Sequence, residues 1–237
     1  MITGDFHVHT CLSPCADITM VPNEMAKRFS YHGLEWIGIT DHNTCGNVKV
    51  FERVFSKYGI TVLPGIEVQS VEEVHVLGYF ESVETAEEFS KVIYSHLPDI
   101  KNDPERFGYQ LFVDEEDHFT GTEEKILASS TDLHLDELFK LIKAFKGLFV
   151  YAHVERTFGV LKQLGFIPDS PPYDALETIR KIKSDKAILK SSDAHTLDQI
   201  GTSVVKVGVN HRTFEEFKRA LERRLVFIDE DNSRSYS

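Results

Sequence analysis

The chain has 237 residues, and its 26 basic and 38 acidic side chains give a formal charge of −12. Apolar residues make up 41% and charged residues 27%, which is ordinary for a globular domain and excludes global disorder. The acidic balance opposes sequence-independent capture of a nucleic-acid backbone, so we expect no extended nucleic acid among the partners.

Short β-branched runs alternate with segments of helical period along the chain, which predicts an α/β fold. The predicted strands are residues 2–8, 36–40, 60–66, 74–80, 148–152, 187–191 and 204–207. Apolar spacing predicts helices within residues 48–58, 135–145 and 214–221. This order favours one domain over residues 1–237, with a largely parallel sheet, open or closed into a barrel, and its chemistry at the carboxyl ends of the strands.

Residues 97–132 interrupt this order with LPDIKNDPERFGYQ and the acidic VDEEDHFTGTEEK. A long segment with little periodicity is predicted to be an insertion on the barrel, and it is either a lid over the site or a solvated excursion. Asp132 is predicted to cap the helix that begins near His134. Residues from about 229 to 237 are predicted to form a frayed tail.

Signals for secretion or membrane insertion are not found in the sequence. No apolar run approaches the roughly 20 residues that span a bilayer, and the N-terminus has neither a basic leader nor an apolar core. The cysteines Cys11, Cys15 and Cys45 are too few for a disulfide framework. We therefore expect a cytoplasmic protein without a membrane partner, and the oligomeric state stays open.

Side chains that bind metal ions follow or lie within the predicted strands. His7 and His9 are two residues apart at the end of the first strand, so both project from the same face. The full candidate set is His7, His9, His42, Glu67, His75, His153, Asp193 and His195. Imidazole and carboxylate ligands suit Zn, Mn or Fe rather than Ca. Because one ion needs only three or four protein ligands, the set predicts two ions, or three where a carboxylate bridges.

A centre of this kind stabilises the attacking and leaving oxygens of an in-line displacement and lowers the pKa of a bound water to about 7. Phosphate ester hydrolysis is the reaction class that uses these properties most. The metal ligands would therefore also be the catalytic residues, acting through the bound ions.

Six motifs, DFHVHT, TDH, GIE, EVHVLGY, AHV and SDAH, occur in this order along the chain. Each is a weak signal alone, but together they resemble the polymerase and histidinol phosphatase (PHP) superfamily over nearly the whole chain. The resemblance implies a distorted (β/α)7 barrel with a trinuclear metal centre at its C-terminal face. It also implies phosphoesterase activity, which many members possess.

The resemblance also divides the ligands among the ions. It implies one ion held by His7, His9, Glu67 and Asp193, a second held by Glu67, His75 and His153, and a third held in part by His42 and His195. Members of the family commonly place a histidine or an aspartate for the third ion in the loop after the first histidine pair.

This chain has CLSPCAD in that loop. Cys15 lies six residues after His9, which is the position of the histidine in family members, and we predict that it is a ligand favouring Zn or Fe. Asp17 is the alternative.

Several polar residues near these motifs have two interpretations. Arg156 and Lys190 are candidates to bind a substrate phosphate, although both are equally compatible with ordinary surface charges. Asp5 either orients a ligand histidine or pairs with a neighbouring charge. For Asp41, structural hydrogen bonding is at least as well supported as catalysis.

The sequence therefore predicts a metal-dependent phosphoesterase that hydrolyses a small phosphomonoester or nucleotide with a metal-activated water. A small phosphorylated substrate is the expected partner, and two or three divalent ions are the expected cofactors. One alternative is a nuclease or phosphodiesterase acting on short single strands, which the net charge disfavours. Another is a non-catalytic metal-dependent binding module, which the intact ligand set disfavours.

Overall fold

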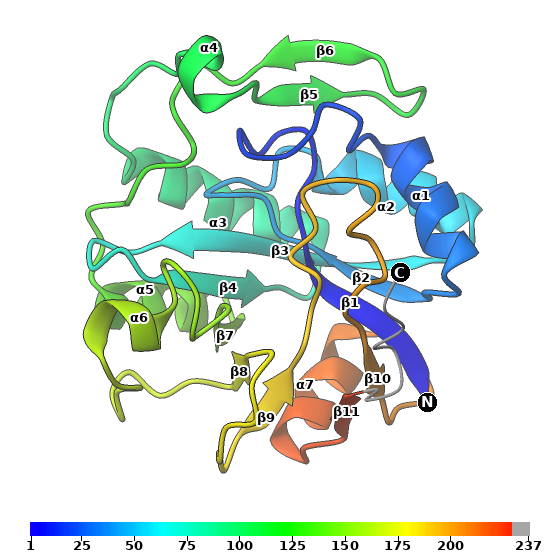
Figure 1. Ribbon diagram of the computed structural model, residues 1–237. Helices are drawn as coiled ribbons and strands as arrows, with labels where there is room; N and C mark the ends of the chain where they lie inside the picture. Colours follow the sequence, from blue (N-terminus) through cyan, green and yellow to red (C-terminus); the bar gives the residue numbers. More distant parts are fainter. Residues whose placement is uncertain (229–237) are drawn as a thin grey trace, which may run out of the picture.

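A nine-stranded sheet curls into a nearly closed barrel in the computed structural model, which describes residues 1–228 (Figure 1). The spatial order of the strands is β11-β10-β1-β2-β3-β4-β7-β8-β9. Their bounds are β1 (Ile2–Val8), β2 (Trp36–Ile39), β3 (Thr61–Gln69), β4 (His75–Tyr79), β7 (Leu148–Tyr151), β8 (Ala175–Glu177), β9 (Ala187–Leu189), β10 (Val205–Val207) and β11 (Val226–Ile228). The predicted α/β barrel is confirmed, and the tail predicted over residues 229–237 lies outside the described residues.

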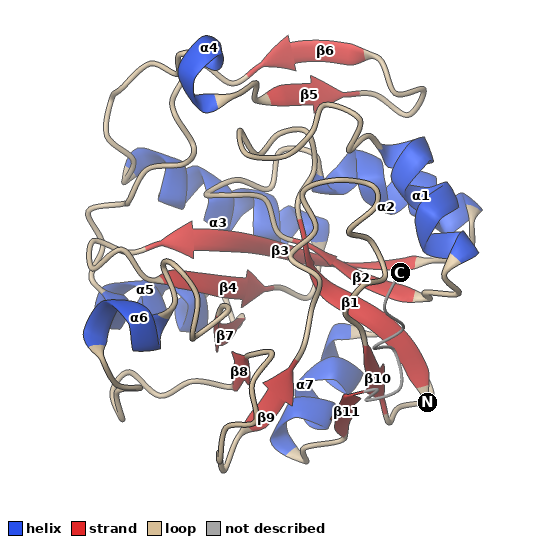
Figure 2. Ribbon diagram, viewed as in Figure 1, coloured by secondary structure: helices blue, strands red, loops and turns tan. Residues whose placement is uncertain are grey.

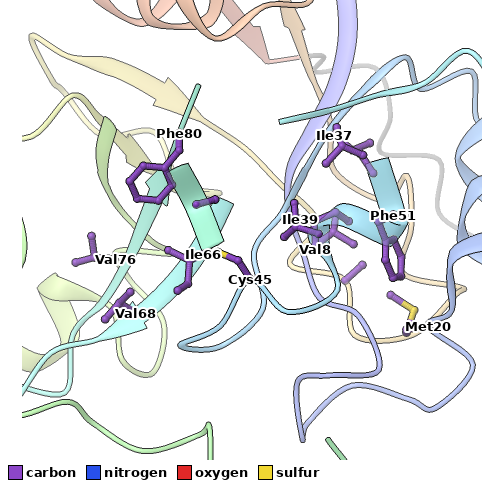
Figure 3. Close-up of a cluster of buried hydrophobic side chains, with 14 of the residues drawn as sticks. Val8, Met20, Ile37, Ile39, Cys45, Phe51, Ile66, Val68, Val76 and Phe80 are labelled. Carbon is purple, nitrogen blue, oxygen red and sulfur yellow. The ribbon is translucent and has the colours of Figure 1, made fainter. Parts of the chain in front are cut away.

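The larger helices lie around the curled sheet, on its outer face or across one end (Figure 2). They are α1 (Pro22–Tyr31), α2 (Val48–Lys57), α3 (Val83–Ser95), α5 (Leu135–Ala144), α6 (Val160–Leu164) and α7 (Phe214–Glu222). The predicted apolar face of α2 is buried, and its Phe51 belongs to the same core cluster as Ile37 and Ile39 of β2 (Figure 3). This outer core packs against the outward face of the strands. The opposite face of each strand therefore points into the barrel interior.

A second apolar cluster fills the barrel interior towards one end. Phe217 of α7 lies with its ring centroid 4.4 Å from Phe6, 5.4 Å from Trp36 and 5.6 Å from Tyr79. The Tyr79 hydroxyl donates a hydrogen bond of 2.7 Å to the Phe6 carbonyl oxygen, which satisfies its polar atom inside the core. Polar side chains that face the interior are therefore confined to the other end of the barrel.

The direction of β4 differs from the expected largely parallel sheet. The β1–β2–β3 and β7–β8–β9 pairs are parallel, but β4 is antiparallel to both β3 and β7, and β10 and β11 are antiparallel as well. Since β4 runs backwards, its first residue, His75, lies opposite Gln69 at the end of β3. This reversal explains why a ligand at the start of a strand reaches ligands at the ends of others.

A register shift in β1 places the first histidine pair. The pairing with β2 shifts between Asp5 and Val8. Phe6 packs in the inner cluster whereas Val8 packs in the outer one, although strict alternation would put both on one face. A register shift of this kind changes the direction in which side chains point, and here it turns His7 and His9 towards the barrel interior.

The segment predicted as an insertion has secondary structure of its own. It contains α4 (Pro104–Phe107) and a separate antiparallel pair, β5 (Leu111–Val113) and β6 (Phe119–Thr122), which lies over the loop between β1 and α1 (Figure 1). The backbone amide of Leu111 donates to the Cys11 carbonyl at 2.9 Å, and a small apolar cluster joins Leu12 to Leu97 and Leu127.

Two details correct the predictions. The N-cap of α5 is His134, whose backbone amide donates to Glu137 Oε2 at 2.9 Å, whereas the Asp132 carboxylate accepts from His96 Nδ1 at 2.7 Å instead of capping the helix. Outside the insertion, the elements α1, α3, α6, β8 and β11 were not predicted. Across residues 1–228, no helix combines the length and apolar character that crossing a bilayer requires.

Candidate metal centre

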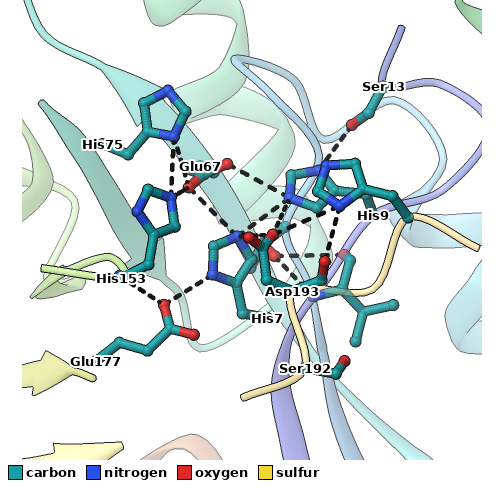
Figure 4. A network of polar contacts seen from close by, with 12 residues as sticks. His7, His9, Ser13, Glu67, His75, His153, Glu177, Ser192 and Asp193 are labelled. Carbon is teal, nitrogen blue, oxygen red and sulfur yellow. Dashed lines mark hydrogen bonds and ion pairs between the residues drawn. The ribbon is translucent and has the colours of Figure 1, made fainter. Parts of the chain in front are cut away.

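The predicted ligands meet at the open end of the barrel, around the carboxylate of Glu67 (Figure 4). Glu67 Oε1 lies 2.9 Å from His75 Nδ1 and 3.1 Å from His153 Nε2. Its other oxygen, Oε2, lies 3.0 Å from His42 Nδ1. One buried carboxylate is therefore surrounded by imidazoles from three separate loops or strands.

His7, His9 and Asp193 form a second group beside Glu67. The Nε2 atoms of His7 and His9 are 3.1 Å apart, and each lies 3.2 Å from Asp193 Oδ1. Glu67 Oε1 lies 3.3 Å from His7 Nε2. The structure thus brings together the four residues that the resemblance assigns to one ion.

His195 and His42 approach the centre from the other side of His9. The His195 ring stacks on His9 with centroids 4.2 Å apart, and the His42 ring lies 4.5 Å from His9. The candidate ligand atoms of these three residues lie within 4.8 Å of one another. His9 therefore joins the pair expected for the third ion and lies between two groups.

Cys15 lines the same cavity as His42 and His195, whereas Asp17 does not. Burial would raise the pKa of the Cys15 thiol, but the nearby His42 charge and hydrogen bonds with His195 and His42 outweigh it and lower the pKa to about 5. Asp17 instead accepts hydrogen bonds from the amide and hydroxyl of Thr19, at 2.8 and 2.6 Å. The geometry favours the thiolate over the aspartate as the additional ligand.

Glu177, at the end of β8, orients His7. Its Oε2 lies 2.8 Å from His7 Nδ1 and accepts from the His153 backbone amide at 3.1 Å. Because a carboxylate accepts, His7 Nδ1 carries a proton, which leaves Nε2 as the atom that would bind a cation. Glu177 was not among the predicted site residues, and the only available signal in the sequence was an acidic residue directly after the apolar pair Ala175 and Leu176.

Ser13 orients His9 in the same way. The Ser13 hydroxyl donates to Asp41 Oδ1 at 2.7 Å, and its oxygen lies 2.9 Å from His9 Nδ1, from which it accepts. Asp41 also accepts from the Thr10 amide and hydroxyl, each at 2.7 Å. The structural interpretation of Asp41 therefore fits its contacts, and Ser13 is a second residue that the sequence analysis missed.

Asp5 connects β1 to the loop that carries Asp193. Its Oδ1 accepts from the Ser192 amide at 3.1 Å, and its Oδ2 accepts from the Ser192 hydroxyl. Complete burial raises the pKa of Asp5 to about 7, although the hydrogen bonds from Ser192 act in the opposite direction. Asp5 thus holds a ligand-bearing loop and does not pair with a cation.

Burial and neighbouring charges together set the pKa values of the carboxylates and imidazoles in the centre. Burial raises the pKa of Glu67 and Asp193, but the surrounding histidines outweigh this effect and hold both carboxylates ionised well below their usual range. Burial lowers the pKa of His75 to about 4, whereas nearby anionic groups outweigh burial and raise the pKa of His7, His9 and His42, so a cation that binds these three rings would displace protons.

The residues present fit a multinuclear metal centre. Glu67 Oε2 and Asp193 Oδ1 are buried oxygens without a hydrogen-bond partner among residues 1–228. Buried polar atoms of this kind usually have a partner, and a divalent cation between the carboxylates and imidazoles would provide one. Nitrogen, carboxylate and thiolate donors are the ligand types of Zn, Mn and Fe.

The ligand cluster forms the floor of a cavity of about 740 Å³. Its walls come from the end of β3, from the insertion (Pro98 and residues 128–130), and from the loop after β7 (residues 156–158). The Phe158 ring stacks on His75 with centroids 4.9 Å apart and an interplanar angle of 14°. A cavity of this size accommodates a small organic molecule in addition to a phosphate group.

The two candidate cations occupy different places. Arg156 lines the cavity, and its Nη2 atom lies 2.6 Å from Asp193 Oδ2. Lys190 lines a separate pocket with Ile188, so its predicted place at the metal site is wrong. The reason is strand alternation, because Ala187 and Leu189 face the inner core and the residues between and after them face outward.

The remaining histidines lie outside the cavity lining. Of the described residues, the cavity lining does not include His32, His96, His118, His134 or His211. Cys11 and Cys45 are buried free thiols that contact backbone carbonyls.

Comparison with known proteins identifies a family and several related folds. The model of the PHP domain family matches residues 5–232. No curated protein sequence matches the chain. Endonuclease Q from Pyrococcus furiosus, a lesion-specific endonuclease, superposes with a TM-score of 0.67 at 18% identity, covering 96% of this chain. This chain spans only 57% of that endonuclease. A structure of endonuclease Q in complex with a 27-mer duplex that has an abasic lesion at the active site matches with the same TM-score and identity.

Two smaller proteins match over nearly their whole length. A protein from Bifidobacterium adolescentis, assigned as a metal-dependent phosphoesterase, has a TM-score of 0.57 and 15% identity, covering 93% of this chain and 96% of its own. An amidohydrolase from Chromobacterium violaceum with bound sulfate and no metal has a TM-score of 0.53 and 15% identity, covering 96% and 98%. At these identities the likenesses establish a common fold.

Proposed function

Because the chain belongs to the PHP domain family and is a hydrolase of that family, we propose that it hydrolyses a small phosphomonoester or nucleotide in a metal-dependent reaction. The observation that carries the proposal is the placement of Glu67 among three ligand groups on the floor of an open cavity. The residues of these groups are candidates for catalysis because they meet where a substrate phosphate would enter.

We assign the residues as three overlapping ligand groups. They are His7, His9, Glu67 and Asp193; Glu67, His75 and His153; and His9, His42 and His195 with Cys15. Two or three ions of Zn, Mn or Fe bound there would activate a water molecule and neutralise charge that develops on the phosphoryl oxygens.

The protein groups around the ligands have their own tasks. Glu177 and Ser13 hold the protons of His7 Nδ1 and His9 Nδ1 away from the centre, so that both Nε2 atoms remain free to bind. Arg156 is exposed at the rim beside Asp193, where its guanidinium can hold the oxygens of an entering phosphate. The cavity walls separate the bound ester from bulk water.

The test is elemental analysis of protein purified without chelator, combined with assays on phosphomonoesters, nucleotides and diesters with added Mn, Zn or Fe. We expect two or three metal equivalents and metal-dependent release of phosphate from a monoester. Bound metal without turnover of any ester would favour a binding module, and a chain without tightly bound metal would refute the ligand assignment.

A nuclease or phosphodiesterase is the second candidate, and the likeness of fold to endonuclease Q favours it. The formal charge of −12 and the exposed carboxylate of Glu73 on the cavity rim oppose a long polyanion. Comparison of a chromogenic monoester with a bis-ester and a short single-stranded oligonucleotide separates the candidates. Faster turnover of the oligonucleotide, with steep salt dependence, would replace the monoesterase proposal.

We place the enzyme in a reducing compartment such as the cytoplasm. All three cysteines are unpaired, and Cys15 needs to remain a thiolate to bind metal.

A further inference from the structure

Gln69 lies on β3 next to the candidate metal centre. The proposed function assigns it no role. It is two residues beyond Glu67, so both side chains project from the same face of the strand, about 6–7 Å apart along it. It also pairs directly with His75 across β3 and β4. A group attached to a phosphate at the ligand cluster would therefore reach Gln69 first along this wall.

Gln69 is largely buried, and its carboxamide has no hydrogen-bond partner among the described residues. Only 8% of the residue is exposed, and it lines the cavity. Its backbone amide donates to Asn43 Oδ1 at 3.2 Å, and its carbonyl accepts from the Thr131 amide and hydroxyl, each at 2.9 Å. Across residues 1–228 the carboxamide itself makes no hydrogen bond. Its donors and acceptor are accessible from the cavity and are therefore available to a ligand.

Two serines of the insertion line the same cavity. Neither the Ser129 nor the Ser130 hydroxyl hydrogen-bonds within the described chain, and both residues are half-buried. Asn43 fixes their segment, because its Nδ2 atom donates to the Leu127 carbonyl at 2.7 Å and to the Ser129 carbonyl at 2.9 Å. Their backbone is thus held in place before a ligand arrives.

The side chains of Gln69, Ser129 and Ser130 are uncharged. A carboxamide and two hydroxyls offer donors and acceptors but no charge. Arg156 is the one lysine or arginine among the described residues of the cavity lining, and it is paired with Asp193, whereas the exposed Glu73 adds negative charge at the rim. A second anionic group on the substrate would therefore lack a counter-charge here, while a neutral polar group would find partners.

We propose that Gln69, Ser129 and Ser130 form a leaving-group subsite for the uncharged alcohol of a phosphomonoester, one that carries hydroxyl or amide groups. This inference rests on the proposed phosphoesterase function and adds its substrate class. A sugar and a nucleoside share the required chemistry. Pro98, Ala128 and Phe158 supply apolar surface in the same cavity, against which a sugar ring or a base can pack.

The experiment compares phosphate release from three esters by the metal-loaded protein. Adenosine monophosphate and glucose 6-phosphate carry neutral hydrogen-bonding groups, whereas phenyl phosphate carries none. In Gln69→Ala we expect kcat/KM to fall about tenfold or more for at least one polar ester, because the partner groups lose their hydrogen bonds. Phenyl phosphate turnover and metal content should stay within about twofold of the unaltered protein.

A matched control and a binding measurement accompany the kinetics. Gln163→Ala removes the same carboxamide from α6, outside the cavity lining, and should change none of the three rates. Calorimetric titration of non-hydrolysable phosphonate analogues should show weaker binding of the polar analogue to Gln69→Ala. The pair Ser129→Ala and Ser130→Ala should weaken binding in the same direction.

The experiment distinguishes failure of the subsite from failure of the proposed phosphoesterase function. If the unaltered protein hydrolyses no monoester, the proposed function fails and the subsite with it. If it hydrolyses all three and Gln69→Ala lowers them equally, Gln69 supports the metal centre and the subsite is refuted. Selective loss for the nucleotide identifies a nucleoside leaving group, and selective loss for the sugar phosphate identifies a sugar, with either result supporting the subsite.

Discussion

His7 and His153 share one carboxylate oxygen of Glu177, which accepts from a ligand ring and from a ligand backbone. We predict that Glu177→Ala lowers metal affinity about 10–100-fold, because His7 loses the acceptor that fixes its tautomer and ring orientation. Glu177→Gln retains an acceptor oxygen and should lose less. Competition with a chromogenic chelator measures both affinities.

Glu155→Gln is the matched control for this prediction, because Glu155 accepts from the Ile179 backbone amide and is not in contact with a ligand ring. Equal metal affinity in Glu177→Ala and the unaltered protein would show that His7 keeps its orientation without the carboxylate.

Cys15 is the residue at which this chain departs from the ligand pattern of its family. Because its pKa is about 5, the thiol is ionised at neutral pH and available to a soft metal ion. We predict that Cys15→Ser loses about one metal equivalent in elemental analysis, whereas Asp17→Asn keeps the full complement. The opposite pattern would assign the ligand to Asp17.

Several non-glycine residues of the site have a positive φ, a backbone conformation that could not be predicted from the sequence. Eight non-glycine residues among those described have positive φ, and four of them, Glu73, His153, Phe158 and Asp193, line the cavity. Such conformations are sparsely populated and persist only where surrounding structure enforces them. The motifs identified His153 and Asp193 as ligands, but their orientation depends on contacts from distant segments.

At the scale of the elements, the apolar runs predicted the positions of the main strands. Whether each strand is parallel or antiparallel to its neighbours could be determined only from the tertiary structure. A run such as residues 75–79 has the same pattern whether its strand is parallel or antiparallel. The β8 strand is only three residues long, too short for periodicity, and it carries Glu177. The α3 helix did offer a signal, because its buried residues Val83, Ala86, Phe89 and Ile93 follow helical spacing.

Asn43, which has a φ of 54°, is one of the residues that connect the insertion to the barrel. Its side chain bonds to Leu127, Ser129 and Gln69. We predict that Asn43→Ala destabilises the protein by about 2–4 kcal/mol, through lost hydrogen bonds and the cost of this φ for alanine. Urea unfolding measures the free energy.

Asn43→Gly separates the two effects, since glycine adopts positive φ without strain but also lacks the carboxamide. It should recover about 1 kcal/mol relative to alanine. Limited proteolysis within residues 97–132 should accelerate in both variants, and an unchanged cleavage rate would mean that other contacts hold the insertion.

At the scale of the whole molecule, the candidate metal ligands lie at the open end of the barrel, while Phe217 and its partners fill the other end. Removal of the ions should therefore lower the thermal stability of the entire barrel. At a metal concentration 100 times the dissociation constant, binding contributes about 2.7 kcal/mol, and we predict a fall in Tm of about 5–10 °C on chelation.

Differential scanning calorimetry with and without EDTA measures this change, and added Zn or Mn should restore the original Tm. Calcium is the control, because imidazole-rich sites do not suit it. Identical Tm values in all conditions would indicate that the ligand cluster is stable without ions.

The clustering of the candidate ligands could be predicted because each candidate lies in a short motif beside an apolar strand, and the family pattern orders these motifs. Ser13 and Glu177, which orient candidate ligands, and Gln69 of the proposed subsite could not be predicted, since each becomes recognisable only when distant segments meet. Lys190 shows the limit of proximity in sequence, because a residue three positions before Asp193 faces the opposite side of the sheet.

Glu67 has only two carboxylate oxygens, yet these lie within 3.4 Å of nitrogens from His7, His9, His42, His75 and His153. Ions bound around it cannot load as independent sites, because each one changes the charge and orientation of a ligand that its neighbours use. Thermodynamic coupling is reciprocal, so the first ion alters the affinity of the second by the same factor as the reverse. A metal titration of this protein should therefore deviate from a sum of separate binding isotherms.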